Sequence, residues 1–175
     1  MPHATTLEAF LSSIPIFGGL SEATLRRLAP LLEAHEIPAG KEVCVEGENG
    51  RAMFILRSGE ALVWRETPSG QKVKLARLGP GEFFGEMALI DPQPRSASVV
   101  VQKDALLYAL NNRGLYQLYV EDMQGYVMVL QNLSRELVRR LRKADERICE
   151  MVEEEADPEC TQIRPGPFAT RRNPR

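Results

Sequence analysis

The sequence predicts an α+β protein. A β-roll or jelly-roll barrel of about eight antiparallel strands is expected between a pair of N-terminal helices and a long C-terminal helix. Two observations predict this arrangement. Residues 36–110 alternate short apolar runs with glycine and proline turns, which is typical of strands. The flanking residues 7–34 and 111–155 instead space their leucines three and four apart, as amphipathic helices do.

The N-terminal segment, residues 1–34, is expected to hold two short helices. Pro15 ends the first helix, because the residue before a proline avoids the α region. Ser21 is a favourable N-cap for the second helix, and Pro30 is expected to kink or end it.

The β-unit, residues 35–110, divides at its turn signals into short strands. Glycines at regular intervals, each beside polar or small residues, mark the turns. This spacing indicates a two-sheet or closed antiparallel unit. The runs expected to form strands are residues 36–38, 42–45, 52–56, 61–66, 72–77, 96–101 and 105–110.

Residues 111–155 return to a helical pattern, with Asn111 or Asn112 as the cap of a first helix. A second helix from about residue 123 to 155 has apolar residues at near-heptad steps. About 30 helical residues extend roughly 45 Å, more than a small β-unit covers, so we expect two such helices to form a homodimer. The alternative is a helix packed on its own β-unit. Residues 156–175, rich in proline and arginine, are expected to be a disordered tail.

Composition excludes several classes of protein. The net charge of −2 argues against a general nucleic-acid coat or a membrane-surface binder. No apolar run approaches the roughly 20 residues that span a bilayer, and the N-terminus lacks a secretory pattern. The cysteines (Cys44, Cys149 and Cys160) have no C-x-x-C spacing, which favours free thiols in the cytoplasm and no metal site.

Residues 83–99, FFGEMALIDPQPRSASV, carry the most chemistry. Gly85 lets the backbone approach a ligand, and the helical turn after it offers amide groups and a dipole to an anion. Arg95 supplies a planar guanidinium suited to phosphate, and Ser96 adds a hydroxyl donor. Glu86 would repel a phosphate but would accept a hydrogen bond from a sugar hydroxyl. These groups together indicate a nucleotide, whereas the alternative is a surface ion pair of Glu86 with Arg95 beside a proline turn.

The same residues resemble the phosphate-binding cassette of the cyclic-nucleotide-binding domain family, F-G-E-x-A-L-x…P-R-x-A-x-V. The resemblance extends from about Leu7 to about Arg147. It implies that Glu86 binds the ribose 2′-hydroxyl, that Arg95 and Ser96 bind the cyclic phosphate, and that nearby backbone amides complete the cradle. The ligand-binding residues that it implies in the cassette are Phe84, Gly85, Glu86, Met87, Ala88, Arg95, Ser96 and Ala97.

The resemblance also implies that the C-terminal helix covers the base. By comparison with bacterial activator proteins, the residues near the purine fall around Ala144 and Asp145. Asp145 would accept a hydrogen bond from an exocyclic amine, which suits guanine; otherwise it is a solvated acid in an i,i+4 ladder. The implied ligand is cyclic AMP, with cyclic GMP as the alternative. Arg51 departs from the pattern, since many family members have an acidic residue there.

The sequence therefore predicts a cytoplasmic, homodimeric cyclic-nucleotide sensor, not an enzyme, which signals through its C-terminal helix to a protein partner. Family transcription factors carry a helix-turn-helix domain after the long helix, but only about 20 residues follow here, so no DNA-binding domain is expected. The alternatives are a ligand-free scaffold, a regulatory fragment of a larger protein, and a cupin-like metal enzyme. The enzyme requires several histidines, and His35 is the only one in the β-unit.

Overall fold

The structure is a computed structural model that describes residues 6–91 and 93–152. The chain divides into two compact units, one up to Glu136 and one from Leu137. The first unit contains the N-terminal helices, the sheet and the beginning of helix α5 (Met123–Val152); the second contains the rest of α5. No helix of the described residues is long and apolar enough to cross a membrane.

The N-terminal segment forms two α-helices separated by a 3₁₀ turn. Ser21 caps the second helix, because its hydroxyl accepts a hydrogen bond from the backbone amide of Thr24 at 3.1 Å, as the sequence predicts. Pro30 lies in a 3₁₀ turn that ends this helix, and Leu32 is already extended. The helical segment is therefore shorter than predicted, since β1 begins at Glu33. The elements are α1 (Leu7–Ser12), η1 (Pro15–Phe17), α2 (Glu22–Leu28) and η2 (Ala29–Leu31).

A six-stranded antiparallel sheet follows, with the strand order β1-β6-β3-β4. Strand β2 also pairs with β6, and β5 pairs with β3. The sheet curls into a roll, which confirms the predicted β-roll. Strand pairing among the described residues does not close it into a barrel. The strands are β1 (Glu33–Ile37), β2 (Glu42–Cys44), β3 (Ala52–Glu66), β4 (Lys72–Leu78), β5 (Phe83–Phe84) and β6 (Ser98–Asn111).

Two long strands replace four of the predicted short ones. Residues 52–56 and 61–66 belong to one strand, β3, and residues 105–110 and most of 96–101 belong to β6. The glycine expected to turn the chain, Gly59, has a φ of +92° and lies where the register of β3 against β6 shifts. A Cβ at Gly59 would lie 2.7 Å from the Cα of Ala105, so the glycine permits a bulge between two close strands. The predicted turn at this position is wrong.

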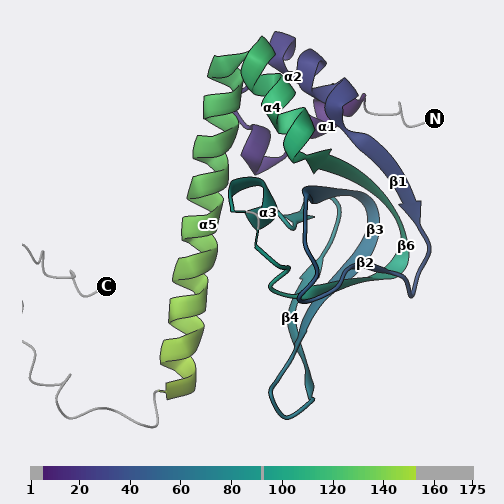
Figure 1. The fold of residues 1–175 in the computed structure, drawn as a ribbon, viewed down its shortest axis with the longest axis vertical. Helices are drawn as coiled ribbons and strands as arrows, with labels where there is room; N and C mark the ends of the chain where they lie inside the picture. The colour runs from purple at the N-terminus through teal and green to yellow at the C-terminus, as the bar shows by residue number, and fades with distance from the viewer. Residues whose placement is uncertain (1–5, 92, 153–175) are drawn as a thin grey trace, which may run out of the picture. The chain divides into compact units, whose positions relative to one another are not determined.

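Two apolar clusters form the core, one on each side of β3. Met53 and Ile55 pack with the helices, whereas Leu56 and Phe54 pack inside the roll. This alternation follows from the two-residue period of a strand. Helices α1, α2 and α4 (Asn112–Glu121) gather at one end of the roll, at the top of Figure 1. The roll interior is lined by Cys44, Leu56, Ala61, Leu78, Phe84, Val99, Val101, Ala105 and Leu107.

The C-terminal helices begin as the sequence predicts. The Asn111 side chain caps α4 by accepting a hydrogen bond from the amide of Gly114 at 2.8 Å. Early in α5, Asn132 donates to the carbonyls of Ile16 at 3.2 Å and Gly18 at 2.9 Å. These bonds hold the first half of α5 on the N-terminal segment. Residues 153–155 of the predicted helix and the predicted tail, residues 156–175, lie outside the described residues.

Candidate ligand-binding site

The predicted cassette forms a turn, a short helix and a returning loop. Gly85 follows β5 with a φ of +74°, a conformation that favours glycine, and α3 (Met87–Ile90) begins two residues later. The returning loop pairs with the segment after β2. The amide of Gly47 donates to the carbonyl of Arg95 at 2.9 Å, and the amide of Arg95 donates to the carbonyl of Glu48 at 2.8 Å. The backbone of Arg95 is thus fixed at both of its polar groups.

The side chain of Arg95 is held by backbone carbonyls. Its Nη1 donates to the carbonyl of Gly85 at 3.0 Å, and its Nη2 donates to the carbonyl of Ala52 at 2.7 Å. The Cζ atom lies 5.8 Å from the centre of the Phe54 ring. A guanidinium has five N–H donors, and these contacts use two of them. Arg95 therefore has a fixed head group with donors left for an anionic ligand.

Glu86 is buried in the same cassette. It is 4% exposed and occupies the N-cap position of α3, without a side-chain capping bond. The alternative of an exposed surface pair with Arg95 does not apply, because Glu86 is buried and Arg95 is half-buried. A buried carboxylate requires hydrogen-bond donors around it. The role predicted for Glu86, an acceptor for a ribose hydroxyl, suits this position and stays a prediction.

The other predicted cassette residues surround this pair. The Ser96 hydroxyl is exposed and lies 3.9 Å from the sulfur of Met87, which is also exposed. Ala88 is buried, and its amide donates to the Gly85 carbonyl at 3.3 Å, so this amide already serves the turn. Phe84 stacks on Phe54 with ring centres 5.3 Å apart. Ala97 is half-buried just before β6.

Asp145 belongs to the second unit. It lies on α5 and is exposed, as are residues 146–151. Its predicted contact with the base stays a prediction.

Three residues that hold Arg95 were missed in the sequence. Gly50, Ala52 and Phe54 lie more than 40 residues before Arg95 along the chain, and none has a polar side chain. Ala52 contributes only a backbone carbonyl, which leaves no mark on the sequence. Cys44 was also missed as a neighbour. Burial raises the pKa of its thiol, while the charge of Arg95 lowers it and that of Glu48 raises it.

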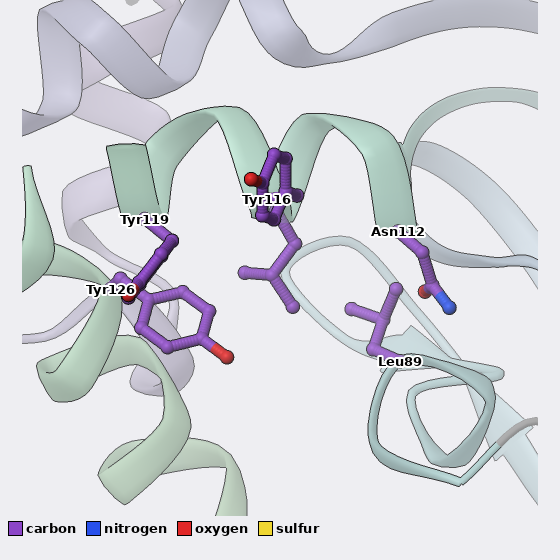
Figure 2. A pocket seen from close by; sticks show the side chains of 6 residues that line it. Leu89, Asn112, Tyr116, Tyr119 and Tyr126 are labelled. Carbon is purple, nitrogen blue, oxygen red and sulfur yellow. The ribbon is translucent and has the colours of Figure 1, made fainter. Parts of the chain in front are cut away.

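A cavity of about 260 Å³ lies on the helical side of the cassette (Figure 2). It separates α3 from α4 and the first turn of α5, and Tyr119 and Tyr126 meet edge to face with ring centres 5.3 Å apart. Beside it, the side chain of Asn112 donates to the carbonyl of Ala88 at 3.3 Å, which joins α4 to the cassette. The sequence did not indicate this cavity. Its lining residues are Leu89, Asn112, Leu115, Tyr116, Tyr119 and Tyr126.

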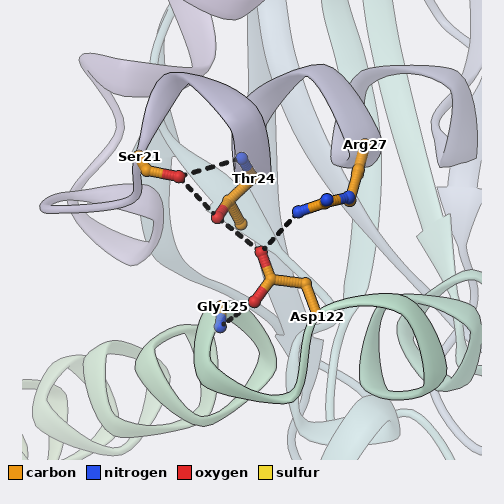
Figure 3. Close-up of polar contacts among 5 residues, drawn as sticks. All are labelled: Ser21, Thr24, Arg27, Asp122 and Gly125. Carbon is orange, nitrogen blue, oxygen red and sulfur yellow. Dashed lines mark hydrogen bonds and ion pairs between the residues drawn. The ribbon is translucent and has the colours of Figure 1, made fainter.

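A polar network anchors the junction of α4 and α5 (Figure 3). One carboxylate oxygen of Asp122 accepts from the amide of Gly125 at 2.9 Å. The other accepts from the hydroxyl of Thr24 at 2.6 Å and from Nη1 of Arg27 at 3.3 Å. Because the single hydroxyl proton of Thr24 goes to Asp122, the hydroxyl of Ser21 is the donor in its 2.9 Å contact with Thr24. The caps of α2 and α5 are thereby linked.

The described residues contain no group of three or more acidic, histidine or cysteine side chains that could hold a metal ion. His35 is exposed on β1, with its Nε2 atom 3.8 Å from a carboxylate oxygen of Glu33.

An antiparallel roll with an arginine fixed in a turn–helix–loop cassette has the features of a domain that binds a small anionic ligand, because the guanidinium is held with donors left over. The comparison with known families identifies the particular one. The chain belongs to the cyclic nucleotide-binding domain family, whose sequence profile matches residues 34–122, half of the chain. This result confirms the predicted family.

Two curated relatives are similar in sequence. The chain is 37% identical to the cyclic AMP receptor protein of Thermus thermophilus over 131 residues, 75% of this chain and 59% of the relative. It is also 37% identical to the cAMP-dependent protein kinase regulatory subunit of Aspergillus fumigatus over 118 residues, 66% of this chain and 28% of the relative. The chain thus spans only part of these relatives.

Solved structures agree with the fold. The catabolite activator protein of Thermus thermophilus has a TM-score of 0.73 at 35% identity, over 81% of this chain and 64% of that one. A cyclic nucleotide-binding domain from Methylobacillus flagellatus KT has a TM-score of 0.74 at 28% identity, over 83% of this chain and 82% of that one. The predicted fold class, a roll with helices at both ends of the sequence, is confirmed.

Proposed function

We propose that this protein is a regulatory sensor that binds cyclic AMP in its cassette. The observation that supports this most directly is the geometry of Arg95, whose guanidinium is fixed on two carbonyls beside the buried Glu86. A cyclic phosphate needs a fixed cation, and a ribose needs a hydrogen-bond acceptor close to it. The names of the two curated relatives, a cyclic AMP receptor and a cAMP-dependent kinase regulatory subunit, favour the same ligand.

In this proposal each cassette residue has one task. Arg95 binds the cyclic phosphate with its remaining donors, and Ser96 adds a hydroxyl from the exposed loop. Glu86 accepts the ribose 2′-hydroxyl. Asp145 reads the base, and a carboxylate there would favour the adjacent N–H donors of guanine, so cyclic GMP is the competing ligand.

The cassette would report its occupancy through the helices. The bond from Asn112 to the Ala88 carbonyl joins α3 to α4, and the Asp122 network fixes α4 and α5 to α2. A ligand that moves α3 would therefore shift α4 and the start of α5. Such a shift is limited by the difference in ligand affinity between the two arrangements. We propose that a protein partner in the cytoplasm reads the change, and that the protein itself catalyses no reaction.

Isothermal titration of ligand-free protein with cyclic AMP and cyclic GMP tests the proposal. We expect saturable binding of one of them. Arg95→Ala should weaken it roughly 100-fold, because a charge-assisted contact contributes up to about 3 kcal/mol. Arg26→Ala is the matched control, since Arg26 is exposed on α2 and pairs only with Glu22 among the contacts described. Absence of heat with both nucleotides would reject the sensor and leave the ligand-free scaffold.

A further inference from the structure

Gly50 is buried against the guanidinium of Arg95. A Cβ built on Gly50 would lie 2.8 Å from Nη1 of Arg95, and closer still to Cζ and Nε. Gly50 is not among the glycines with positive φ, so its φ does not by itself require glycine. The three atoms nearest to this Cβ all belong to Arg95, so the arginine is the nearest obstacle to a side chain at this position.

Gly85 borders the same guanidinium. A Cβ at Gly85 would lie 3.2 Å from Cζ of Arg95 and closer to Nη1. The carbonyls of Gly85 and Ala52 hold the two terminal nitrogens, and the Phe54 ring lies 5.8 Å from Cζ. We call these residues (Gly50, Ala52, Phe54 and Gly85) the arginine seat. It is built almost entirely from backbone.

We propose that Gly50 is a positioning residue for Arg95, and that the arginine seat fixes the guanidinium before any ligand arrives. The inference rests on the proposed function, because its consequence is an affinity for a phosphate. An arginine that is already immobilised loses less side-chain entropy when it binds. A planar fork also binds a phosphate well only in a narrow range of orientations. Gly50 contributes to both effects without contact with the ligand.

A side chain at Gly50 should displace the arginine and leave the fold intact. The three atoms nearest to an added Cβ belong to the far end of the flexible Arg95 side chain. Arg95 is half-buried, so its head group has a route to solvent. Gly50→Ala is therefore expected to break the bonds to Gly85 and Ala52 while the roll stays folded.

The first experiment compares Gly50→Ala with Gly79→Ala by titration with cyclic AMP. Gly79 is a matched control, because it also lacks a positive φ and its Cβ would meet nothing closer than Glu82 at 3.9 Å. We expect Gly50→Ala to lose affinity by roughly 10- to 100-fold, as a displaced charged donor would. Gly79→Ala should bind as the wild type does. Wild-type affinity in Gly50→Ala overturns the inference.

A second readout does not depend on any ligand. The Nε–H signal of Arg95 in the NMR spectrum of the ligand-free protein is assigned by its loss in Arg95→Ala. We expect this signal to shift or broaden in Gly50→Ala and to stay unchanged in Gly79→Ala. A protein that binds no cyclic nucleotide but shows this change would reject the proposed function and keep the inference. An unchanged signal overturns the inference alone.

If Gly50→Ala prevents folding, the double variant Gly50→Ala with Arg95→Ala tests whether the contact with the guanidinium is the cause. Arg95→Ala removes the three atoms that lie nearest to a Cβ at position 50. The double variant is then expected to fold with the melting temperature of Arg95→Ala alone, because the two substitutions act through one contact. A double variant that stays unfolded overturns the inference.

Discussion

Asp122, between α4 and α5, binds both α2 and the first turn of α5. Its carboxylate accepts hydrogen bonds from Thr24, Gly125 and Arg27, and these donors favour its charged form. The Thr24 bond has the largest effect, followed by that of Gly125, and together with the charge of Arg27 they hold the pKa of Asp122 below its usual 3.8. The stability of the helical junction is thereby linked to pH.

The acid limb of unfolding should report this linkage. Because the pKa of Asp122 is lower in the folded state, its contribution to stability is fully present above the unfolded-state value and is lost as the pH falls through the folded-state value. We expect the stability difference between wild type and Asp122→Asn to be constant from pH 7 to about 5 and to shrink below pH 3.8. Urea unfolding of both proteins at about ten pH values between roughly 2.5 and 7 measures this difference in the free energy of unfolding.

Titration of other acids does not affect the difference in stability between wild type and Asp122→Asn. The pKa of Glu60 is also lowered, chiefly by its hydrogen bond from Lys103. It is present in both proteins and cancels in the difference. A stability difference that does not change between pH 5 and pH 3 would show that the network does not favour the carboxylate.

Some residues of the candidate site can be recognised in the sequence, and others cannot. Glu86 and Arg95 could be singled out because they lie in one string of residues, F-G-E-x-A-L-x…P-R-x-A-x-V, that resembles a known cassette. Gly50 and Ala52 could not, because they act through an absent side chain and a backbone carbonyl. Only the fold brings them to Arg95. The cavity beside Leu89 was equally hidden, since its walls come from three helices.

At the scale of elements, the N-caps of two helices were predictable, whereas the continuity of the two long strands was not. Ser21 and Asn111 cap their helices through bonds to residues three positions away, so the signal is local. Gly59 carries an ambiguous signal, because a glycine in a strand pattern serves a turn or a bulge equally well. Gly59 forms a bulge because it lies close to Ala105 on β6, and this proximity depends on the pairing of β3 with β6, which the local sequence does not show.

The contact of α2 with α5 gives a test at this scale. A Cβ on Gly125 would lie 3.1 Å from Oδ2 of Asp122 and closer to Cγ2 of Thr24. Alanine usually stabilises a helix by about 1 kcal/mol relative to glycine. Here we expect Gly125→Ala to destabilise by about 1–3 kcal/mol, because overpacking outweighs propensity. Urea unfolding at neutral pH measures the change.

A second substitution identifies the cause. Thr24→Ser removes the methyl group that the new Cβ would meet and keeps the hydroxyl that donates to Asp122. The double variant Thr24→Ser with Gly125→Ala should therefore regain most of the lost stability. If the double variant is no more stable than Gly125→Ala, the contact between α2 and α5 is not what requires glycine.

At the scale of the whole molecule, the second half of α5 has apolar side chains in contact with water. Leu141, Ile148 and Met151 are 61%, 54% and 75% exposed. Leu141 and Ile148 are one heptad apart, which places them on one stripe, and Ala144 lies between them. A stripe of this kind is buried in other long helices by a second helix. The sequence predicts that the second helix belongs to another copy of the chain.

The mass of the protein in solution tests this pairing. We expect sedimentation equilibrium to give about 39 kDa, twice the 19.6 kDa of one chain. Leu141→Asp with Ile148→Asp should give the mass of a single chain, because two carboxylates in a helix interface cost several kcal/mol to bury. Glu146→Gln, on the same helix but off the stripe, is the control and should leave the dimer intact.

The same measurement with cyclic AMP shows whether ligand binding and dimerisation are coupled. A ligand that binds the dimer more tightly than the monomer must lower the dissociation constant of the dimer. A wild-type protein that has the mass of one chain with and without ligand would contradict the predicted homodimer, and would assign the exposed stripe to a different partner.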